Sequence, residues 1–141
     1  MTNQITTTWL GEMKFESTNP SGQKLFIDAG EEHGGKSDGY RPKALMLSSL
    51  AGCSGLDVAS LIKKMKLDVS DFKIDIDAEL TEEHPKYYNK VAMHFHFYGN
   101  KLNENKLQKA VDLSIEKYCG VMEMFRQFAE LKIETHFHKK E

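Results

Sequence analysis

The chain has 141 residues, 40% of them hydrophobic, which suits one soluble globular domain over residues 1–141 with a modest core. Its formal net charge of −2 and its pI of about 6.3 give no electrostatic reason to expect nucleic acid or a membrane surface as a partner. The N-terminus lacks a basic start followed by an apolar run, so we predict no signal peptide. Because we predict no signal peptide and the chain has only two cysteines, we expect it to work in a reducing cytoplasm.

The N-terminal part of the chain predicts a β-hairpin followed by a flexible loop. Threonines and a tryptophan at 6–9 favour a strand, "NPSG" at 19–22 marks a turn, and Leu25 and Ile27 alternate with polar residues. We therefore predict one hairpin over residues 5–28. Residues 29–41 contain four glycines and predict a mobile loop.

A long helix is predicted from Pro42 to about Lys66, because proline suits a first helical turn and the run that follows has little charge. The stretch 44–62 contains Asp57, four serines and two glycines, so we interpret it as a buried helix of a soluble protein rather than a membrane span. Since this helix is apolar on most sides, it must be covered on most sides. In so small a chain, we expect a partner subunit to supply part of that cover.

The second half of the chain predicts strands mixed with helices. "FKIDIDAEL" at 72–80 and "VAMHFHFYG" at 91–99 alternate between apolar and polar residues and predict an antiparallel pair. Asn103 can cap a helix that Gly120 ends, a short helix follows over 121–130, and "LKIETHFHK" at 131–139 predicts a last strand. The fold class predicted is α+β, with an antiparallel sheet wrapped around a central helix.

Cys53 in the long helix and Cys119 at the junction of two later helices form no local CxxC motif. Composition alone favours two buried cysteines that act as small hydrophobic side chains. The alternative is a working thiol. Amides at the start of the later helix would lower the pKa of Cys119, whereas Asp57, four residues after Cys53, would raise the pKa of Cys53. The nearest arginine in sequence, Arg41, precedes Cys53 by about three helical turns.

Four histidines alternate with apolar residues in two predicted strands, namely His94, His96, His136 and His138. If the two strands pair, the four imidazoles share one face of the sheet, where they are a ligand type that zinc uses. That face should be the solvated side of the sheet, where histidine is ordinary. We therefore predict a solvated face there, with no metal and no cofactor.

Three segments of the sequence resemble the OsmC/Ohr family, the osmotically inducible protein C and organic hydroperoxide resistance proteins. "RPKALMLSSLAGCSGLDVASLIKKMK" resembles the central helix, in which the first cysteine follows the initial proline by eleven positions, as Cys53 follows Pro42 here. "EEHPKYYNKVAMHFHFYG" resembles the family's turn and strand, and "LQKAVDLSIEKYCGVMEMF" resembles the segment around its second cysteine. The resemblance covers nearly the whole chain and is strongest to uncharacterised OsmC-like members.

The resemblance implies an OsmC-like fold, an intertwined homodimer and a redox-active cysteine pair near the subunit interface. By matching position, Cys53 would be the catalytic thiol that attacks an organic hydroperoxide and Cys119 the thiol that resolves the sulfenic acid as a disulfide. A thiol reductant would restore both. The function implied is a peroxiredoxin-like oxidoreductase of oxidative stress defence, acting without a cofactor.

The sequence departs from the family's peroxidases at two positions that hold the cysteine as a thiolate. Those enzymes carry a glutamate just after the helix-starting proline and an arginine in the N-terminal strands, whereas Lys43 and Ala44 follow Pro42 here and no arginine precedes Arg41. Arg41 or Lys43 would have to stabilise the thiolate instead. These departures motivate two alternatives: a non-catalytic dimer that binds a small apolar ligand in the interfacial cavity, and a structural dimer with inert cysteines.

Overall fold

The structure is a computed structural model that describes residues 1–140. The chain forms two compact units, Met1–Met46 and Leu47–Glu141. Each unit contains a three-stranded sheet, and helix α1 (Pro42–Lys64) begins in the first unit and ends in the second.

The first unit is an antiparallel meander of three strands rather than the single hairpin predicted for residues 5–28. Its strands are β1 (Thr6–Trp9), β2 (Phe15–Thr18) and β3 (Lys24–Ile27), paired in the order β1-β2-β3. The turn that the prediction missed joins β1 to β2, where the Leu10 amide donates to the Lys14 carbonyl at 2.8 Å. Gly11 sits there at a φ of +103°, a conformation that glycine adopts without steric cost.

The glycine-rich loop after β3 is held by hydrogen bonds to one buried carboxylate. The prediction of a mobile loop did not foresee these bonds. The Asp28 carboxylate accepts hydrogen bonds from the amides of Ala29, Lys36 and Asp38 at 2.8, 3.1 and 3.2 Å. Burial tends to raise the pKa of Asp28, but these amides together with the charge of Arg41 lower it below its ordinary value. A 3₁₀ turn, η1 (Glu31–His33), lies inside the loop.

Helix α1 starts at Pro42 as predicted and is the one helix of residues 1–140 that is long and apolar enough to cross a membrane by length and composition. The core helix of a soluble protein passes the same test. Within this chain α1 buries Leu50, Ser54 and Val58, while Leu56 stays 75% exposed. The apolar cover that the sequence called for is thus only partly supplied by the chain itself.

The second unit is built on a mixed sheet in the order β4-β5-β6, comprising β4 (Asp71–Leu80), β5 (Tyr88–Tyr98) and β6 (Glu130–His138). The antiparallel pairing of β4 with β5 is as predicted, but β6 joins β5 in parallel, so this sheet is mixed and not wholly antiparallel as predicted. The parallel pairing follows from the helical crossover between them: α2 (Glu104–Leu113), the π-helical turn η2 (Ser114–Tyr118) and α3 (Gly120–Arg126). Asn103 caps α2 as predicted, accepting from the Lys106 amide at 3.1 Å.

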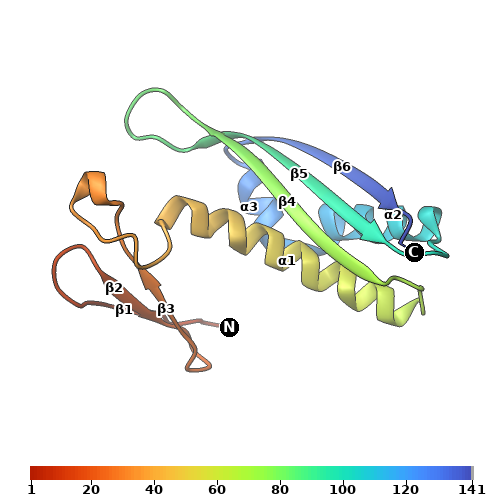
Figure 1. The fold of residues 1–141 in the computed structure, drawn as a ribbon, viewed down its shortest axis with the longest axis horizontal. Helices are drawn as coiled ribbons and strands as arrows, with labels where there is room; N and C mark the ends of the chain where they lie inside the picture. Colours follow the sequence, from red (N-terminus) through yellow and green to blue (C-terminus); the bar gives the residue numbers. More distant parts are fainter. Residues whose placement is uncertain (141) are drawn as a thin grey trace. The chain divides into compact units, whose positions relative to one another are not determined.

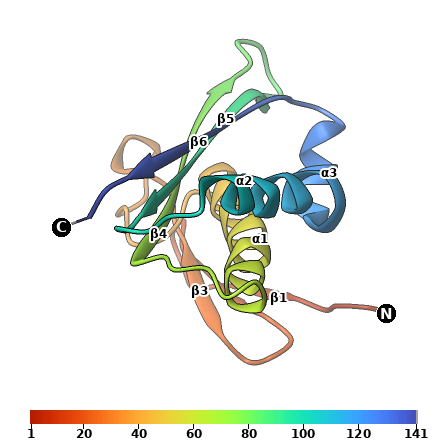
Figure 2. The same cartoon turned by 90° about the vertical axis from the view of Figure 1, so that its right-hand side faces the viewer.

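The helices of this unit cover one face of its sheet and leave the other face uncovered by helices, as Figures 1 and 2 show for α1, α2 and α3. On the covered face, Val91, Met93, Phe95 and Phe97 of β5 are at most 2% exposed. Phe72 of β4 stacks on Phe97 with ring centroids 4.8 Å apart. The other face carries the polar residues of the alternating pattern, and the α+β fold class predicted from the sequence is confirmed.

Candidate functional site

Cys53 lies in the middle of α1, one residue before the buried Ser54. Its side chain is half-buried and packs against the core of the second unit. It therefore combines a sheltered environment with some access to solvent, which a reactive thiol needs.

Cys119 occupies the junction between η2 and α3, as the sequence predicted, and is 4% exposed. Its sulfur caps α3, accepting a hydrogen bond from the Met122 amide at 3.3 Å. Its own amide donates to the Ser114 carbonyl at 2.8 Å, closing the π-helical turn. Such turns are rare and often occur at functional sites.

The structure brings the two cysteines together although they are remote in the sequence. Cys119 belongs to the apolar core cluster and Cys53 packs against that cluster, near enough to Cys119 to help raise the pKa of its thiol. Both are free thiols in the described residues. Neighbouring thiols can be oxidised to a disulfide, a step that removes two electrons and two protons.

Burial raises the pKa of the Cys119 thiol from its ordinary value of 9.0 to about 11. The hydrogen bond with Cys53 and the negative charge of Asp57 act in the same direction, while the Met122 amide opposes them. The Met122 amide does lower the pKa of Cys119, as expected of a helix amide, but desolvation outweighs it and the net shift is upward. At neutral pH this thiol is protonated and a poor nucleophile.

Three polar side chains beside the thiols form a hydrogen-bonded chain that the sequence interpretation did not identify. The Ser114 hydroxyl lies 3.0 Å from Oδ2 of Asp57 and 2.8 Å from the Ser54 hydroxyl. Since a carboxylate only accepts, Ser114 donates to Asp57 and accepts from Ser54. Both serines are 0% exposed. The sequence offered one signal for this buried serine. Ser114 continues the helical spacing of Leu107 and Val111, so a small polar residue lies on the apolar face of a predicted helix.

Arg41 and Lys43, the cations predicted to stabilise a thiolate, belong to the first compact unit. The Arg41 guanidinium donates to the Gly39 carbonyl at 3.1 Å and to the Ser37 hydroxyl at 2.9 Å. Neither of these two hydrogen bonds involves Cys53. A role for either cation at the thiol stays a prediction.

The condition set for the histidines is met: β5 and β6 pair, and His94, His96, His136 and His138 share the sheet face opposite the core. The rings stack in a continuous series, with centroid separations of 5.3 Å for His94–His136 and 4.7 Å for His96–His136. The thiols belong to elements that pack on the opposite, covered face of the sheet.

Comparison with known proteins identifies the family of this chain. The family profile described as OsmC-like protein matches residues 34–134. The chain belongs to the OsmC family. It is 32% identical over 131 residues to Protein YhfA of Escherichia coli strain K12, covering 93% of this chain and 92% of the relative.

Solved structures of OsmC relatives share the fold over nearly the whole chain. A hypothetical protein from Aquifex aeolicus VF5 is 31% identical, with a TM-score of 0.86 and coverage of 100% of this chain and 99% of that one. An organic hydroperoxide resistance protein OsmC from Legionella pneumophila is 20% identical, with a TM-score of 0.70 and coverage of 96% and 97%. At that identity the likeness to the hydroperoxide resistance protein concerns the fold alone.

Proposed function

We propose that this OsmC-family protein is a thiol-dependent peroxidase that reduces organic hydroperoxides, with Cys53 as the attacking thiol and Cys119 as the resolving thiol. The observation that carries the proposal is the proximity of these two thiols at one apolar cluster. The half-buried position of Cys53 against apolar side chains suits an organic substrate better than a strongly hydrated one.

The difference between the two thiols supports the order of the steps. Cys53 is half-buried and reachable, whereas Cys119 is 4% exposed with its pKa raised to about 11. A thiol that is buried and protonated at neutral pH is unsuited to meet a substrate first. It is well placed to react with an oxidised neighbour that is already beside it.

The chemistry proceeds in two steps that balance. The Cys53 thiolate attacks the terminal oxygen of the hydroperoxide, an S–O bond forms as the O–O bond breaks, and the alkoxide takes up a proton and leaves as an alcohol. The sulfur is oxidised by two electrons to a sulfenic acid. Cys119 then attacks that sulfur, an S–S bond forms as the S–O bond breaks, and the proton of the Cys119 thiol passes to the leaving hydroxide, which departs as water. A thiol reductant returns two electrons, so no metal or cofactor is required.

The remaining assignments belong to the same proposal. Arg41 or Lys43 stabilises the Cys53 thiolate, the chain works in a reducing cytoplasm, and residues 1–141 act as one OsmC-like domain in a homodimer. OsmC-family proteins are commonly dimeric. Leu56 of α1 is an apolar side chain that is 75% exposed, which supports a second copy of the chain as the cover for this helix.

Stopped-flow reaction with cumene hydroperoxide tests the proposal. Wild type should consume peroxide and lose both free thiols, whereas Cys53→Ser should abolish consumption. Cys119→Ser is the matched control: it should still form one sulfenic acid per chain, trapped by a dimedone-type reagent, and then stop. If Cys53 reacts no faster than free cysteine, the peroxidase proposal is wrong. Arg41→Ala and Lys43→Ala should each be compared for the rate of the first step.

One observation favours a second function, the binding of a small apolar ligand. Part of α1 and β4 forms an open, largely apolar groove of about 410 Å³, lined by Ala51, Gly52, Gly55, Leu56, Ala59, Phe72, Lys73 and Ile74. In a dimer this groove would contribute to the interfacial cavity. Native mass spectrometry of freshly purified protein should then show a co-purified ligand, and absence of both a ligand and a thermal shift across a lipid panel would contradict this function.

A further inference from the structure

The face of the β4-β5-β6 sheet turned away from the core carries imidazoles next to carboxylates on three neighbouring strands. In the β5–β6 register His94 is paired with Glu134, and His96 with His136. On the other side of β5, Asp75 and Asp77 of β4 lie on the same sheet face, because they are two residues apart in the strand. Imidazole and carboxylate together are a donor set that divalent transition metals bind.

Three atoms of this face form a compact triangle. Nδ1 of His94 lies 3.1 Å from Nε2 of His136 and 3.1 Å from Oε2 of Glu134, and the latter two atoms are 3.7 Å apart. Tetrahedral zinc with bonds of about 2.0–2.1 Å needs ligand atoms about 3.3–3.4 Å apart. An ion at that bond length from all three atoms lies about 0.7 Å above their plane, the height that a regular tetrahedron requires.

The outer nitrogen of His94 also has a suitable partner. Its Nε2 lies 3.9 Å from Oδ2 of Asp77. When Nδ1 binds a metal, the ring proton must sit on Nε2, and the Asp77 carboxylate has to move closer than 3.9 Å before it can accept a hydrogen bond from that nitrogen. Metal-binding histidines commonly donate such a hydrogen bond to a carboxylate, which fixes the tautomer and raises the basicity of the ligating nitrogen.

We propose that His94, Glu134 and His136 form a binding site for a divalent transition metal, Zn²⁺ in particular, with a fourth coordination position left to water or to another ligand. The three residues come from two adjacent strands, so the sheet register holds their spacing. This assignment reverses the expectation of a solvated face without a metal, because sequence alternation places the residues on one face but does not give the triangle.

The neighbouring pair of histidines provides an internal comparison. Nδ1 of His96 lies 2.9 Å from Nε2 of His138, and Nε2 of His96 lies 3.4 Å from Asp75. This pair repeats the contact geometry of His94 and His136. Within residues 1–140, however, only His94, Glu134 and His136 bring three ligand atoms close together, so the pair of His96 and His138 has no third donor. His138 is therefore a matched control for His136 on the same strand and face.

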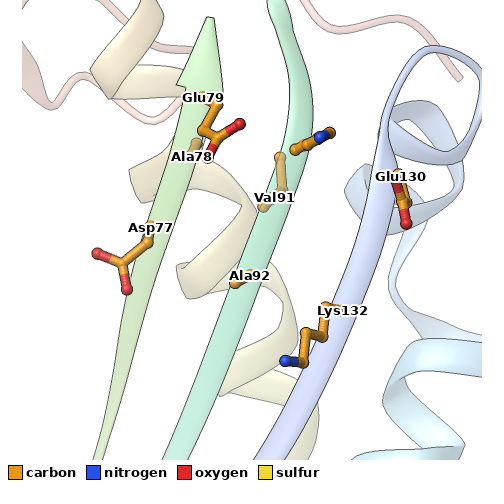
Figure 3. A pocket seen from close by; sticks show the side chains of 8 residues that line it. Asp77, Ala78, Glu79, Val91, Ala92, Glu130 and Lys132 are labelled. Carbon is orange, nitrogen blue, oxygen red and sulfur yellow. The ribbon is translucent and has the colours of Figure 1, made fainter.

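The triangle lies next to a shallow groove on the same sheet face, with a volume of about 360 Å³. Figure 3 shows the small Ala92 of β5 between Asp77 of β4 and Lys132 of β6. The Lys132 ammonium lies 3.4 Å from Oε1 of Glu134, so it uses the carboxylate oxygen that the triangle does not. The groove leaves room for solvent or a small anion to reach a bound ion.

Zinc binding by the full-length, reduced protein tests the site, with Zn²⁺ alone as the probe and a chromophoric chelator as the competitor at about pH 7.5, where ordinary imidazoles are neutral. Wild type should bind one Zn²⁺ per chain. His136→Asn and Glu134→Gln should each weaken binding at least about tenfold, while His138→Asn should stay within about threefold of wild type. Zn²⁺ should raise the thermal unfolding midpoint of wild type and His138→Asn only.

Two further controls keep the test specific to this face. A Cys53→Ser/Cys119→Ser variant should bind Zn²⁺ as wild type does, which separates this site from the thiols and from the peroxidase proposal. If His136→Asn does not fold, Glu134→Gln decides. Absence of Zn²⁺ binding in wild type, equal affinity in wild type and Glu134→Gln, equal loss in His136→Asn and His138→Asn, or loss in the double serine variant would each overturn the proposal.

Discussion

The two faces of the β4-β5-β6 sheet differ in chemistry although the same strands build both. One face holds phenylalanine, methionine and valine against the helices that carry Cys53 and Cys119. The other face holds imidazoles and carboxylates within reach of one another. Because side chains alternate along a strand, each face can change without altering the other. The comparison shows how a small domain can keep a thiol pair apart from metal-binding side chains.

The largest expected effect is on the covered face. Phe95→Ala removes a fully buried ring that stacks at 6.4 Å from Phe72, and should lower the free energy of unfolding by about 3–5 kcal/mol. Lys90→Ala, on the other face of the same strand, should change it by less than about 0.5 kcal/mol. Urea denaturation at fixed protein concentration measures both. Similar losses in the two variants would contradict the division between the faces.

A smaller effect is expected from the buried hydroxyls beside the thiols. Ser114→Ala removes the donor to Asp57 and the acceptor for Ser54, and should cost about 1–3 kcal/mol of unfolding free energy. Because the two serines act through one hydrogen bond, Ser54→Ala/Ser114→Ala should cost less than the sum of the single variants. A strictly additive double-mutant cycle would show that the chain of hydroxyls does not act as a unit.

The two thiols should differ in their pH dependence. Since the pKa of Cys119 is raised to about 11, its thiolate fraction and alkylation rate should stay low at pH 8 and rise about tenfold per pH unit toward pH 11. The folded state prefers this thiol protonated, so the associated stability is full below about pH 9 and is lost as the pH rises toward 11. Site-resolved mass spectrometry after iodoacetamide treatment should find Cys53 modified first. Equal rates at pH 8 would contradict the difference in burial.

The smallest effect concerns the metal-binding face. Lys132→Gln removes a cation that lies 3.4 Å from Glu134, and should tighten Zn²⁺ binding about two- to threefold at low ionic strength. Lys139→Gln, just beyond the end of β6, should leave the affinity unchanged. Chelator competition measures both variants, and weaker binding by Lys132→Gln would mean that Glu134 needs the ammonium to hold its position.

Local patterns in the sequence predicted most of the elements, because Pro42, Asn103 and the alternation in β4 and β5 act through neighbouring residues. They did not predict the turn at Gly11, because it depends on one backbone conformation. They also did not predict the parallel pairing of β6, because it depends on the path of the helical crossover from β5. The proximity of Cys53 and Cys119 was implied by the family resemblance and not by their spacing. The bond between Ser54 and Ser114 escaped prediction because its partners are distant in sequence.

The π-helical turn between Ser114 and Cys119 fixes the rotational phase of the chain that follows it. An i to i+5 bond returns the backbone to nearly the same side of the helix after five residues, whereas five α-helical residues end about 140° away. The serine and the cysteine can therefore both turn toward α1. Deleting one solvent-facing residue, such as Glu116, would restore ordinary winding and swing the sulfur out of line with its neighbour while leaving every reactive group in the polypeptide.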